Sequence, residues 1–539
     1  MAETKILSRA VALDLLSLIA DESGALLAEL EWPTSYGDYA FLSTELVDAV
    51  VVAARSSAAS PELVAVAEAK LSDIVTDLAL IARLCLDLQN LRATGRQPIY
   101  DGTSSIWMKY MDTGGADVGS LVSHARWYYR KPHGAVAGVK RQLRRLHSDA
   151  SALLRTNTTR HDVLNRNTLL DECFAREDIV SIDISPNYRD WPEPDTTPRQ
   201  VQRLVEAVTD TFDSVVSPGS AGDGMLRASA RSLAEAVVAA HFGKAWVDLA
   251  RIRSLITNKR AGAVLASGTP KHMGRLFSWQ YKELGRKVVR FAHGGERAFY
   301  DDYAWSLAEL PYCDRYICHS SAEARHLDLR RSEGRMAVAG PTELVFTGRG
   351  SARHQAIRMR QANRPPHRRR GSVMYVAGGY LGEWLGDFPS RKPPDVLYFD
   401  WQIWLLQALR SRGLHVVTKI HPRGVLNEAQ LLRRYSDDIV DGYFDIEADD
   451  VDCYLFDFAG TAFFDALASN CGVVLVDMGV RPRDAKSFED LHQRCEIVEC
   501  TLAEGNRFRA DPDALAEAVE CASTAQSWPD SFFETYFSS

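Results

Sequence analysis

The feature that most constrains the fold of this chain is a repeated alternation of short β-rich runs with helical stretches. The runs form two series, one that begins near residue 165 and one that begins at Ser372. Such runs are typical of a parallel sheet, because parallel strands need a crossover between them. With 539 residues, the chain is also longer than one hydrophobic core usually holds. We therefore predict an α/β protein with two doubly wound, Rossmann-like domains that face a cleft.

The boundaries of the predicted domains follow from changes in this pattern. Residues 1–160 carry apolar residues at three-and-four spacing and are predicted to form an added helical region. Residues 161–350 and 372–539 hold the two strand–helix series. Residues 351–371 are rich in Arg, Pro and Gly and are predicted to be a basic linker. The arginine run 368–370 in it suits phosphate groups or a membrane, and a solvated linker explains it equally well.

Composition and charge indicate which partners and which cellular compartment to expect. The net charge of −8 argues against a nucleic-acid partner, which needs a basic face. Asp14 interrupts the N-terminal apolar run, so an amphipathic helix is expected there rather than a signal peptide. Nine cysteines without a Cys-x-x-Cys pair indicate reduced thiols. We expect a cytoplasmic protein; the basic stretch 140–147 suggests peripheral contact with the inner membrane surface, with a solvated helix face as the alternative.

Two polar clusters follow strands of the second series directly. Lys419, His421 and Arg423 lie together where one strand ends at a proline, and their side chains suit a phosphate or diphosphate. Gly460 and Thr461 lie between a later strand and a helix, a geometry that offers backbone N–H groups to an anion. An ordinary helix cap at Thr461 is the alternative. Because carboxyl ends of parallel strands meet at one edge, both clusters are predicted to bind the phosphate of one nucleotide.

A third cluster, Gly378-Gly379, follows the first strand of the second series. Glycines at this position let a ligand or a facing domain approach the backbone. We predict that they belong to the same nucleotide site, with a plain tight turn as the alternative reading.

The first series places a histidine and carboxylates at a strand exit. His293 lies beside a Gly-Gly turn and suits a general base for an acceptor hydroxyl. Glu296 and Asp302 are candidates for a base or a nucleophile. Asp301 and Asp302 are adjacent, so their side chains are expected to point to opposite faces, and we predict no metal site. Further residues are predicted to line the cleft: Ser267, Gly268, Thr269 and Gly294.

Several common chemistries lack their motifs. The chain has no Gly-x-x-x-x-Gly-Lys-[Ser/Thr], no His-Glu-x-x-His and no Gly-x-Ser-x-Gly. No Gly-x-Gly-x-x-Gly follows a predicted strand, which argues against a nicotinamide dehydrogenase.

In order and spacing, these motifs resemble bacterial surface-polysaccharide glycosyltransferases of the two-domain GT-B type. That group includes capsule and lipopolysaccharide Kdo transferases, polysialyltransferases and CDP-glycerol glycerophosphotransferases. In these families a strand ends in His-Pro, here His421-Pro422, and a later small-residue or hydroxyl turn starts a helix, here Gly460-Thr461. Glycerophosphotransferases tend to have Ser-Ser at the latter position. A recurring His-Gly of the first domain matches His293-Gly294, and the resemblance covers about residues 260–480.

This resemblance implies a transferase that takes a nucleotide-activated sugar, CMP-linked and Kdo-like, as its donor substrate. The acceptor would be a surface glycan or a lipid-linked glycan. No cofactor is implied, and a metal is not required where Lys and Arg neutralise the leaving phosphate. Two alternatives remain open: a sugar-nucleotide epimerase of the same fold, and a non-catalytic interaction protein that works through residues 1–160.

Overall fold

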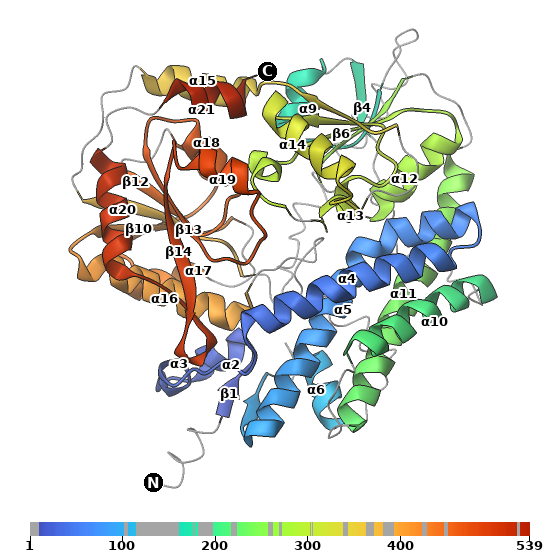
Figure 1. The fold of residues 1–539 in the computed structure, drawn as a ribbon, viewed down its shortest axis with the longest axis horizontal. Helices are drawn as coiled ribbons and strands as arrows, with labels where there is room; N and C mark the ends of the chain where they lie inside the picture. Colours follow the sequence, from blue (N-terminus) through green and yellow to red (C-terminus); the bar gives the residue numbers. More distant parts are fainter. Residues whose placement is uncertain are drawn as a thin grey trace, which may run out of the picture.

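The computed structural model has a mixed α/β architecture with two mainly parallel sheets and a helical N-terminal region (Figure 1). The structure describes residues 10–101, 106–114, 161–175, 178–181, 198–216, 224–256, 262–268, 272–301, 303, 305–337, 343–362, 371–380, 393–422, 428–446, 451–524 and 529–538.

The first sheet is parallel throughout and has the strand order β4-β3-β5-β6-β7-β8. Its strands are β3 (His161–Asn165), β4 (Ile179–Ser181), β5 (Val264–Ser267), β6 (Val288–Phe291), β7 (Arg315–Cys318) and β8 (Val345–Gly348). The chain runs outward from β3 to β4 and then returns to β5 on the other side of β3. The sheet order therefore reverses between β3 and β5, and a ligand crevice is expected at the carboxyl ends of these two strands.

The second sheet has the order β11-β10-β9-β12-β13-β14-β15, with only β15 antiparallel. Its strands are β9 (Ser372–Val376), β10 (His415–Lys419), β11 (Asp438–Val440), β12 (Cys453–Phe456), β13 (Gly472–Asp477), β14 (Glu496–Ala503) and β15 (Arg507–Ala510). Counted from β9, the parallel strands follow the order 3-2-1-4-5-6 of Rossmann-type sheets. Here the order reverses between β9 and β12, which places the expected crevice at the exits of these strands.

Helices connect the strands of both sheets. Those of the first sheet are α9 (Thr168–Cys173), α12 (His272–Glu283), η3 (Gly295–Ala298), α13 (Trp305–Glu309) and α14 (Ser321–Ser332). Those of the second are α16 (Asp395–Ser411), α17 (Glu428–Leu432), η4 (Arg433–Tyr435), α18 (Thr461–Leu467), α19 (Ala485–Leu491), η5 (Glu504–Asn506) and α20 (Pro512–Thr524). Inner strands such as β5, β12 and β13 are wholly buried, which is typical of a parallel sheet covered on both faces.

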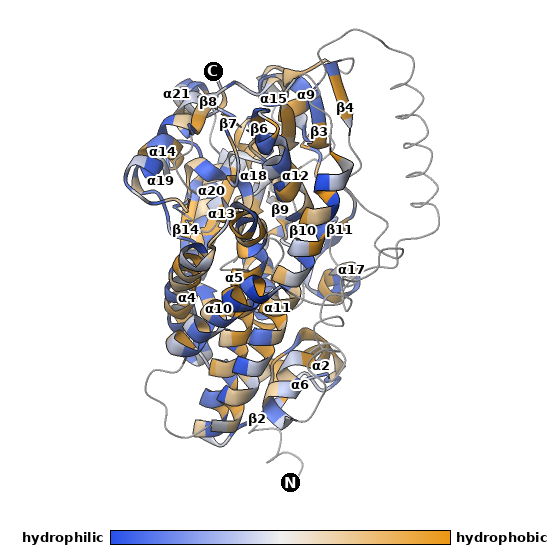
Figure 2. Cartoon of the chain, turned by 90° about the vertical axis from the view of Figure 1, so that its right-hand side faces the viewer, coloured by the Kyte–Doolittle hydropathy of each residue, from blue (hydrophilic) through white to orange (hydrophobic). Residues whose placement is uncertain are grey.

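Four long helices pack together below the two sheets in Figures 1 and 2. They are α4 (Tyr36–Ser57), α5 (Pro61–Thr94), α10 (Arg199–Val216) and α11 (Gly224–Leu255). The ends of α5 follow from sequence: Ser60 accepts a hydrogen bond from the Leu63 N–H at 3.3 Å, and Gly95 ends the helix with φ +68°. The helical layer thus combines helices from the predicted N-terminal region with two that were predicted as part of residues 161–350.

Buried charge pairs hold α5 in this layer. Asp77 of α5 lies 2.6 Å from Nε2 of His241 in α11, and Arg275 of α12 lies 3.2 Å from Asp73. The Arg275 guanidinium also donates to the carbonyl of Ala69. Because removing one partner would leave a buried charge uncompensated, these contacts fix α5 against α11 and α12.

The N-terminal elements also contact the second sheet. They are β1 (Ala10–Ala12) and β2 (Gln97–Ile99), which pair in parallel, with α2 (Leu15–Ala20), α3 (Ala25–Ala28) and α6 (Ile106–Thr113). The Trp32 N–H donates to the carbonyl of Gly505 at 2.9 Å, and the Asn506 amide donates back to the Trp32 carbonyl at 2.8 Å. The helical region therefore packs against both sheets.

The predicted linker contains a helix, α15 (Ala352–Ala362), which lies beside the C-terminal helix α21 (Asp530–Phe537) in Figure 1. Arg353 of α15 makes a two-bond contact with Asp465 of α18, at 3.0 and 2.6 Å. The ring of Phe537 lies 4.8 Å from that of His354. These contacts tie the end of the first strand series to the second sheet, so the described residues 351–362 of the predicted linker are packed against the second sheet. The arginine run 368–370 lies outside the described residues.

Within the described ranges, no helix is both long and apolar enough to cross a membrane.

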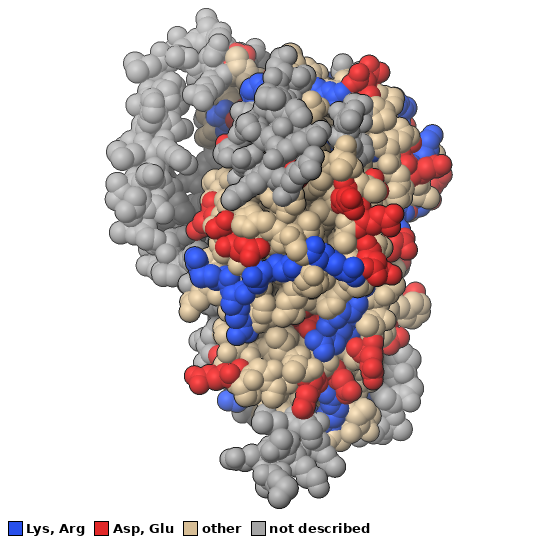
Figure 3. Space-filling model, turned by 90° about the vertical axis from the view of Figure 1, so that its left-hand side faces the viewer, with Lys and Arg blue, Asp and Glu red and all other residues tan. Residues whose placement is uncertain are grey.

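Figure 3 shows the face on the left-hand side of Figure 1, where a band of Lys and Arg side chains is bordered by Asp and Glu. Arginines of α16 and its end pair with acidic residues: Arg410 with Asp437 at 3.1 Å, and Arg412 with Asp513.

Candidate functional site

The two sheets meet at the turn that follows β6. A methyl group at Gly294 would clash with Oε2 of Glu296 and lie 3.5 Å from Oγ1 of Thr461, which starts α18 of the second sheet. A methyl group at Gly295 would lie 2.7 Å from the ring of Phe464, also in α18. The absence of side chains at both glycines therefore allows the exit of β6 to pack directly against the exit of β12.

Arg330 of α14 binds the backbone of this turn through hydrogen bonds to its carbonyl groups. Its Nη1 donates to the carbonyls of Arg297 and Tyr300, each at 2.7 Å, and its Nη2 donates to the carbonyl of Ala298 at 3.0 Å. Its Nη2 also lies 3.4 Å from Asp484 of the second sheet. Since the side chain is fully buried, one guanidinium fixes the η3 backbone and joins it to the facing sheet.

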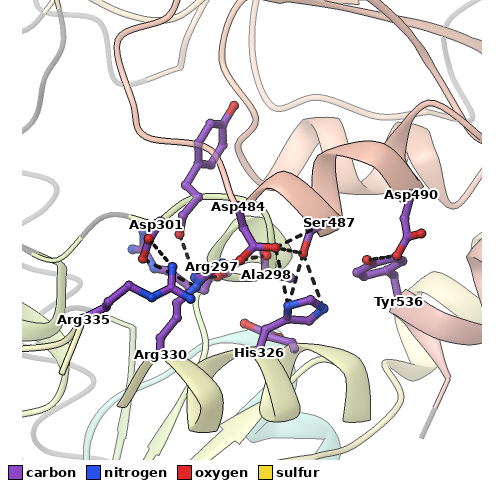
Figure 4. Close-up of polar contacts among 12 residues, drawn as sticks. Arg297, Ala298, Asp301, His326, Arg330, Arg335, Asp484, Ser487, Asp490 and Tyr536 are labelled. Carbon is purple, nitrogen blue, oxygen red and sulfur yellow. Dashed lines mark hydrogen bonds and ion pairs between the residues drawn. The ribbon is translucent and has the colours of Figure 1, made fainter. Parts of the chain in front are cut away.

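Backbone contacts reinforce the same junction. The Asp301 N–H donates to the Pro482 carbonyl, and the Asp484 N–H donates to the Phe299 carbonyl, each at 2.8 Å. Figure 4 shows the side of α14 with Arg330 and His326 pointing toward Asp484 and Ser487. The turn after β6 is therefore held on both sides by groups far apart in the sequence.

Glu296 is the buried carboxylate of the site. Its residue is 7% exposed, its Oε1 lies 3.5 Å from Arg297, and its Oε2 has no hydrogen-bond partner among the described residues. Burial opposes ionisation, but the surrounding positive charge, foremost that of Arg297, outweighs it and holds the pKa of Glu296 below its usual value. The carboxylate is therefore ionised at neutral pH, with one oxygen available at the junction.

His293 is exposed at the same strand exit. A methyl group at Gly268, after β5, would lie 3.1 Å from the Cβ of His293, and the Gly268 φ of +49° suits glycine. Ser267 is tied to β3, since its N–H donates to Oδ1 of Asn165 at 3.0 Å. The structure thus brings together Ser267, Gly268, His293 and Gly294, while Thr269 and Asp302 lie outside the described residues.

In the second sheet, Gly379 lies against His421. A methyl group at Gly379 would be 3.1 Å from Nδ1 of His421, so the exits of β9 and β10 touch. The Gly378 N–H donates to the hydroxyl of Tyr398 at 2.8 Å. Both glycines lie at the point where the order of the second sheet reverses.

Lys419 has local partners. Its buried Nζ donates to the carbonyl of Ile420 at 2.9 Å and to the carbonyl of Gly442. These bonds join β10 to the segment after β11. Phosphate binding by Lys419 stays a prediction, and Arg423 lies outside the described residues.

Asp457 is a site residue that the sequence did not single out. It follows β12 directly and accepts hydrogen bonds from the hydroxyl of Tyr375 at 2.6 Å, from Nε1 of Trp401 at 3.0 Å and from the hydroxyl of Tyr398 at 3.1 Å. Because Tyr398 also contacts Gly378, the network fixes the β9 exit relative to the β12 exit. Its position directly after a strand was the available signal.

His319 and Glu323 are two further buried groups beside this junction. His319 follows β7, and burial together with the nearby His354 lowers its pKa to about 3, so its ring is neutral. The Glu323 carboxylate accepts a hydrogen bond from the His319 N–H at 2.7 Å, and the Ser320 hydroxyl accepts one from the Glu323 N–H at 3.1 Å. Ser320 and Glu323 therefore cap the start of α14. The histidine at a strand exit could have been found from sequence; its burial could not.

Glu323 gives a testable pH dependence. Burial raises its pKa from 4.5 to about 8. The folded state therefore holds the proton more tightly than the unfolded state, and stability falls as pH rises from about 4.5 to about 8. We expect urea unfolding of Glu323→Gln to lack this loss, whose slope approaches about 1.4 kcal/mol per pH unit. Glu333→Gln, at the exposed end of α14, is the control; parallel pH profiles for wild type and Glu323→Gln would contradict the assignment.

No group of three or more His, Cys, Asp or Glu side chains in the described part of the chain is arranged to hold a metal ion.

Comparisons with known proteins give little further identification. No family model matches the chain, and no curated protein matches it significantly. Among solved structures, a UDP-N-acetylglucosamine 2-epimerase from Rickettsia bellii is similar, with 12% identity and a TM-score of 0.34 over 68% of this chain and 87% of that chain. A similarity at this level carries no argument about the chemistry of this chain.

Proposed function

We propose that the protein is a glycosyltransferase that uses a nucleotide-activated sugar, with its reaction centre at the junction around Gly294. One observation carries the proposal: His293 and Glu296 of the first sheet and Thr461 of the second converge on this glycine. An exposed histidine, an ionised buried carboxylate and a hydroxyl thus lie where the carboxyl edges of two parallel sheets meet. This is the place where ligands of such sheets bind.

The donor nucleotide is assigned to the second sheet. Its order reverses between β9 and β12, whose exits carry Gly378-Gly379 and Gly460-Thr461. Thr461 is exposed, so its hydroxyl is available to a phosphate, while Gly378 and Gly379 let Tyr398 and His421 pack closely at the β9 exit. His421, packed on Gly379, would contact the same nucleotide. That the nucleotide is CMP and the sugar Kdo-like rests on the resemblance of the motifs alone.

Transfer then needs two charge movements. His293 takes the proton of the acceptor hydroxyl as its oxygen bonds to the anomeric carbon of the donor sugar. The bond from that carbon to the phosphate oxygen breaks, and its electron pair stays on the leaving nucleotide. The ionised Glu296 interacts electrostatically with His293, so its negative charge would offset the positive charge that develops on the base during transfer. The acceptor, a surface glycan or lipid-linked glycan, would enter from the side of His293.

A thermal-shift screen of CMP, CDP, UDP, GDP and ADP tests the donor assignment. A nucleotide present at 100 times its dissociation constant stabilises the folded state by about 2.7 kcal/mol. We expect a cytidine nucleotide to give the largest shift. Stabilisation by another nucleotide alone would exclude the CMP-linked donor, and no stabilisation by any would exclude the proposed function.

Nucleotide release with and without acceptor separates transfer from epimerisation. A transferase releases its nucleotide in step with glycan product and only when an acceptor is present. An epimerase converts the donor without an acceptor and yields no glycan product. Acceptor-independent conversion would therefore replace the transferase assignment with the epimerase alternative.

A further inference from the structure

The segment after β13 carries an arginine whose surroundings differ from those of its neighbours. The guanidinium of Arg481 lies 4.4 Å from the centre of the Phe458 ring and 5.5 Å from the centre of the Tyr300 ring. No ion pair or hydrogen bond to another described residue engages it. By contrast, Arg483 pairs with Asp477 and, at 2.8 Å, with Glu499. A half-buried guanidinium that makes no ion pair or hydrogen bond within the described residues has N–H donors available to a ligand.

The aromatic contact leaves the donors of Arg481 available. A guanidinium that stacks on a ring uses its face, while its N–H groups point outward in the plane. Phe458 is 44% exposed although it directly follows Asp457 at the β12 exit. A large exposed ring with an arginine stacked on it, at the crevice of the second sheet, is suited to present a forked donor to an oxyanion.

Arg481 lies near the proposed reaction centre, between aromatic rings of two different segments. Tyr300 lies in the segment that follows β6 and η3, and Phe458 lies in the turn that follows β12, so the guanidinium contacts rings from both sides of the junction. Its charge also reaches Glu296, where it helps to lower the pKa of the carboxylate. The arginine therefore faces the same junction as Gly294.

We propose that Arg481, stacked on Phe458, binds an oxyanion of the donor substrate, either the phosphate of the nucleotide or a carboxylate of the sugar. The inference rests on the proposed function and names the group that would hold the anion within that site. Two oxygens of such a ligand would accept the paired N–H groups of the guanidinium.

Calorimetric titration of the full-length protein with three probes tests this assignment: CMP, cytidine and glucuronate. If the phosphate is bound, Arg481→Gln weakens CMP binding roughly 10- to 100-fold and leaves cytidine binding unchanged. If the sugar carboxylate is bound, the variant weakens glucuronate and leaves CMP unchanged. Phe458→Leu, which removes the ring but keeps the charge, should weaken the same probe by a smaller factor. Arg412→Gln, at the end of α16 and away from the strand exits, removes one charge as the control.

Unchanged binding of both anionic probes by Arg481→Gln would overturn the assignment while the proposed function stands. If the wild-type protein binds none of the probes, the proposed function and this inference fall together. Thermal unfolding of each variant checks that a loss of binding does not reflect a loss of folding.

Discussion

Replacement of Glu296 by Gln should lower the rate of sugar transfer on the order of 10²- to 10⁴-fold, the usual contribution of a group that acts on proton transfer. The substitution keeps the shape of the side chain but removes the charge that lies beside His293. Without the carboxylate, the protonated histidine that forms during transfer loses its stabilising neighbour. The measurement is the rate of nucleotide release at saturating acceptor.

Folding should survive this substitution. Arg297, the cation next to Glu296, retains a stronger partner in Glu309 at 2.7 Å. We therefore expect nucleotide binding by Glu296→Gln to stay close to that of the wild type. Glu489→Gln, an exposed glutamate of α19, serves as the matched control. A Glu296→Gln variant that transfers sugar at the wild-type rate would remove Glu296 from the reaction centre.

Replacement of Arg330 by Met should reduce the free energy of unfolding by about 3–5 kcal/mol, the cost of breaking a buried charged network. The guanidinium donates to the carbonyls of Arg297, Ala298 and Tyr300, and methionine leaves all three without that donor. It also leaves Asp484 without a cation at 3.4 Å. Urea unfolding measures the loss.

Position on the helix provides the control for this variant. Arg325 belongs to the same helix but is exposed, so Arg325→Met should change the free energy of unfolding by less than about 0.5 kcal/mol. Activity should fall with Arg330→Met as well, since the turn that carries Glu296 loses its support. A stability change of less than about 1 kcal/mol would mean that the junction does not depend on Arg330.

Much of the strand framework could be predicted from sequence. Apolar runs predict strands at residues 263–266, 287–292, 372–377, 414–420 and 473–477. They are observed as β5, β6, β9, β10 and β13 within a few residues, because buried parallel strands leave continuous apolar runs. Five strands of the two large sheets were not predicted: β3, β8, β11, β14 and β15. Strand β8 shows the reason: it has only four residues, Val-Phe-Thr-Gly, so its apolar run is too short to indicate a strand.

Tertiary relations could not be predicted in the same way. A periodic apolar pattern predicts a helix but not the element against which the helix packs. We therefore predicted that α10 and α11 belong to the domain of the first sheet, whereas they pack against α4 and α5. The residues at the strand exits were found, since their position follows from local pattern. The carbonyl partner of Lys419 at Gly442 and the stacking of Arg481 on Phe458 depend on contacts between distant segments. No spacing in the sequence reports them.

The central claim, that the junction around Gly294 is the substrate site, is tested most directly by one calorimetric titration. The nucleotide that stabilises the wild-type protein most is titrated into wild type and into Gly294→Ala, whose added methyl group would displace the Glu296 carboxylate and lie 3.5 Å from Oγ1 of Thr461. The account predicts binding to the wild type and a loss of at least about tenfold in affinity for a folded Gly294→Ala variant. Equal affinity of the two proteins would contradict it.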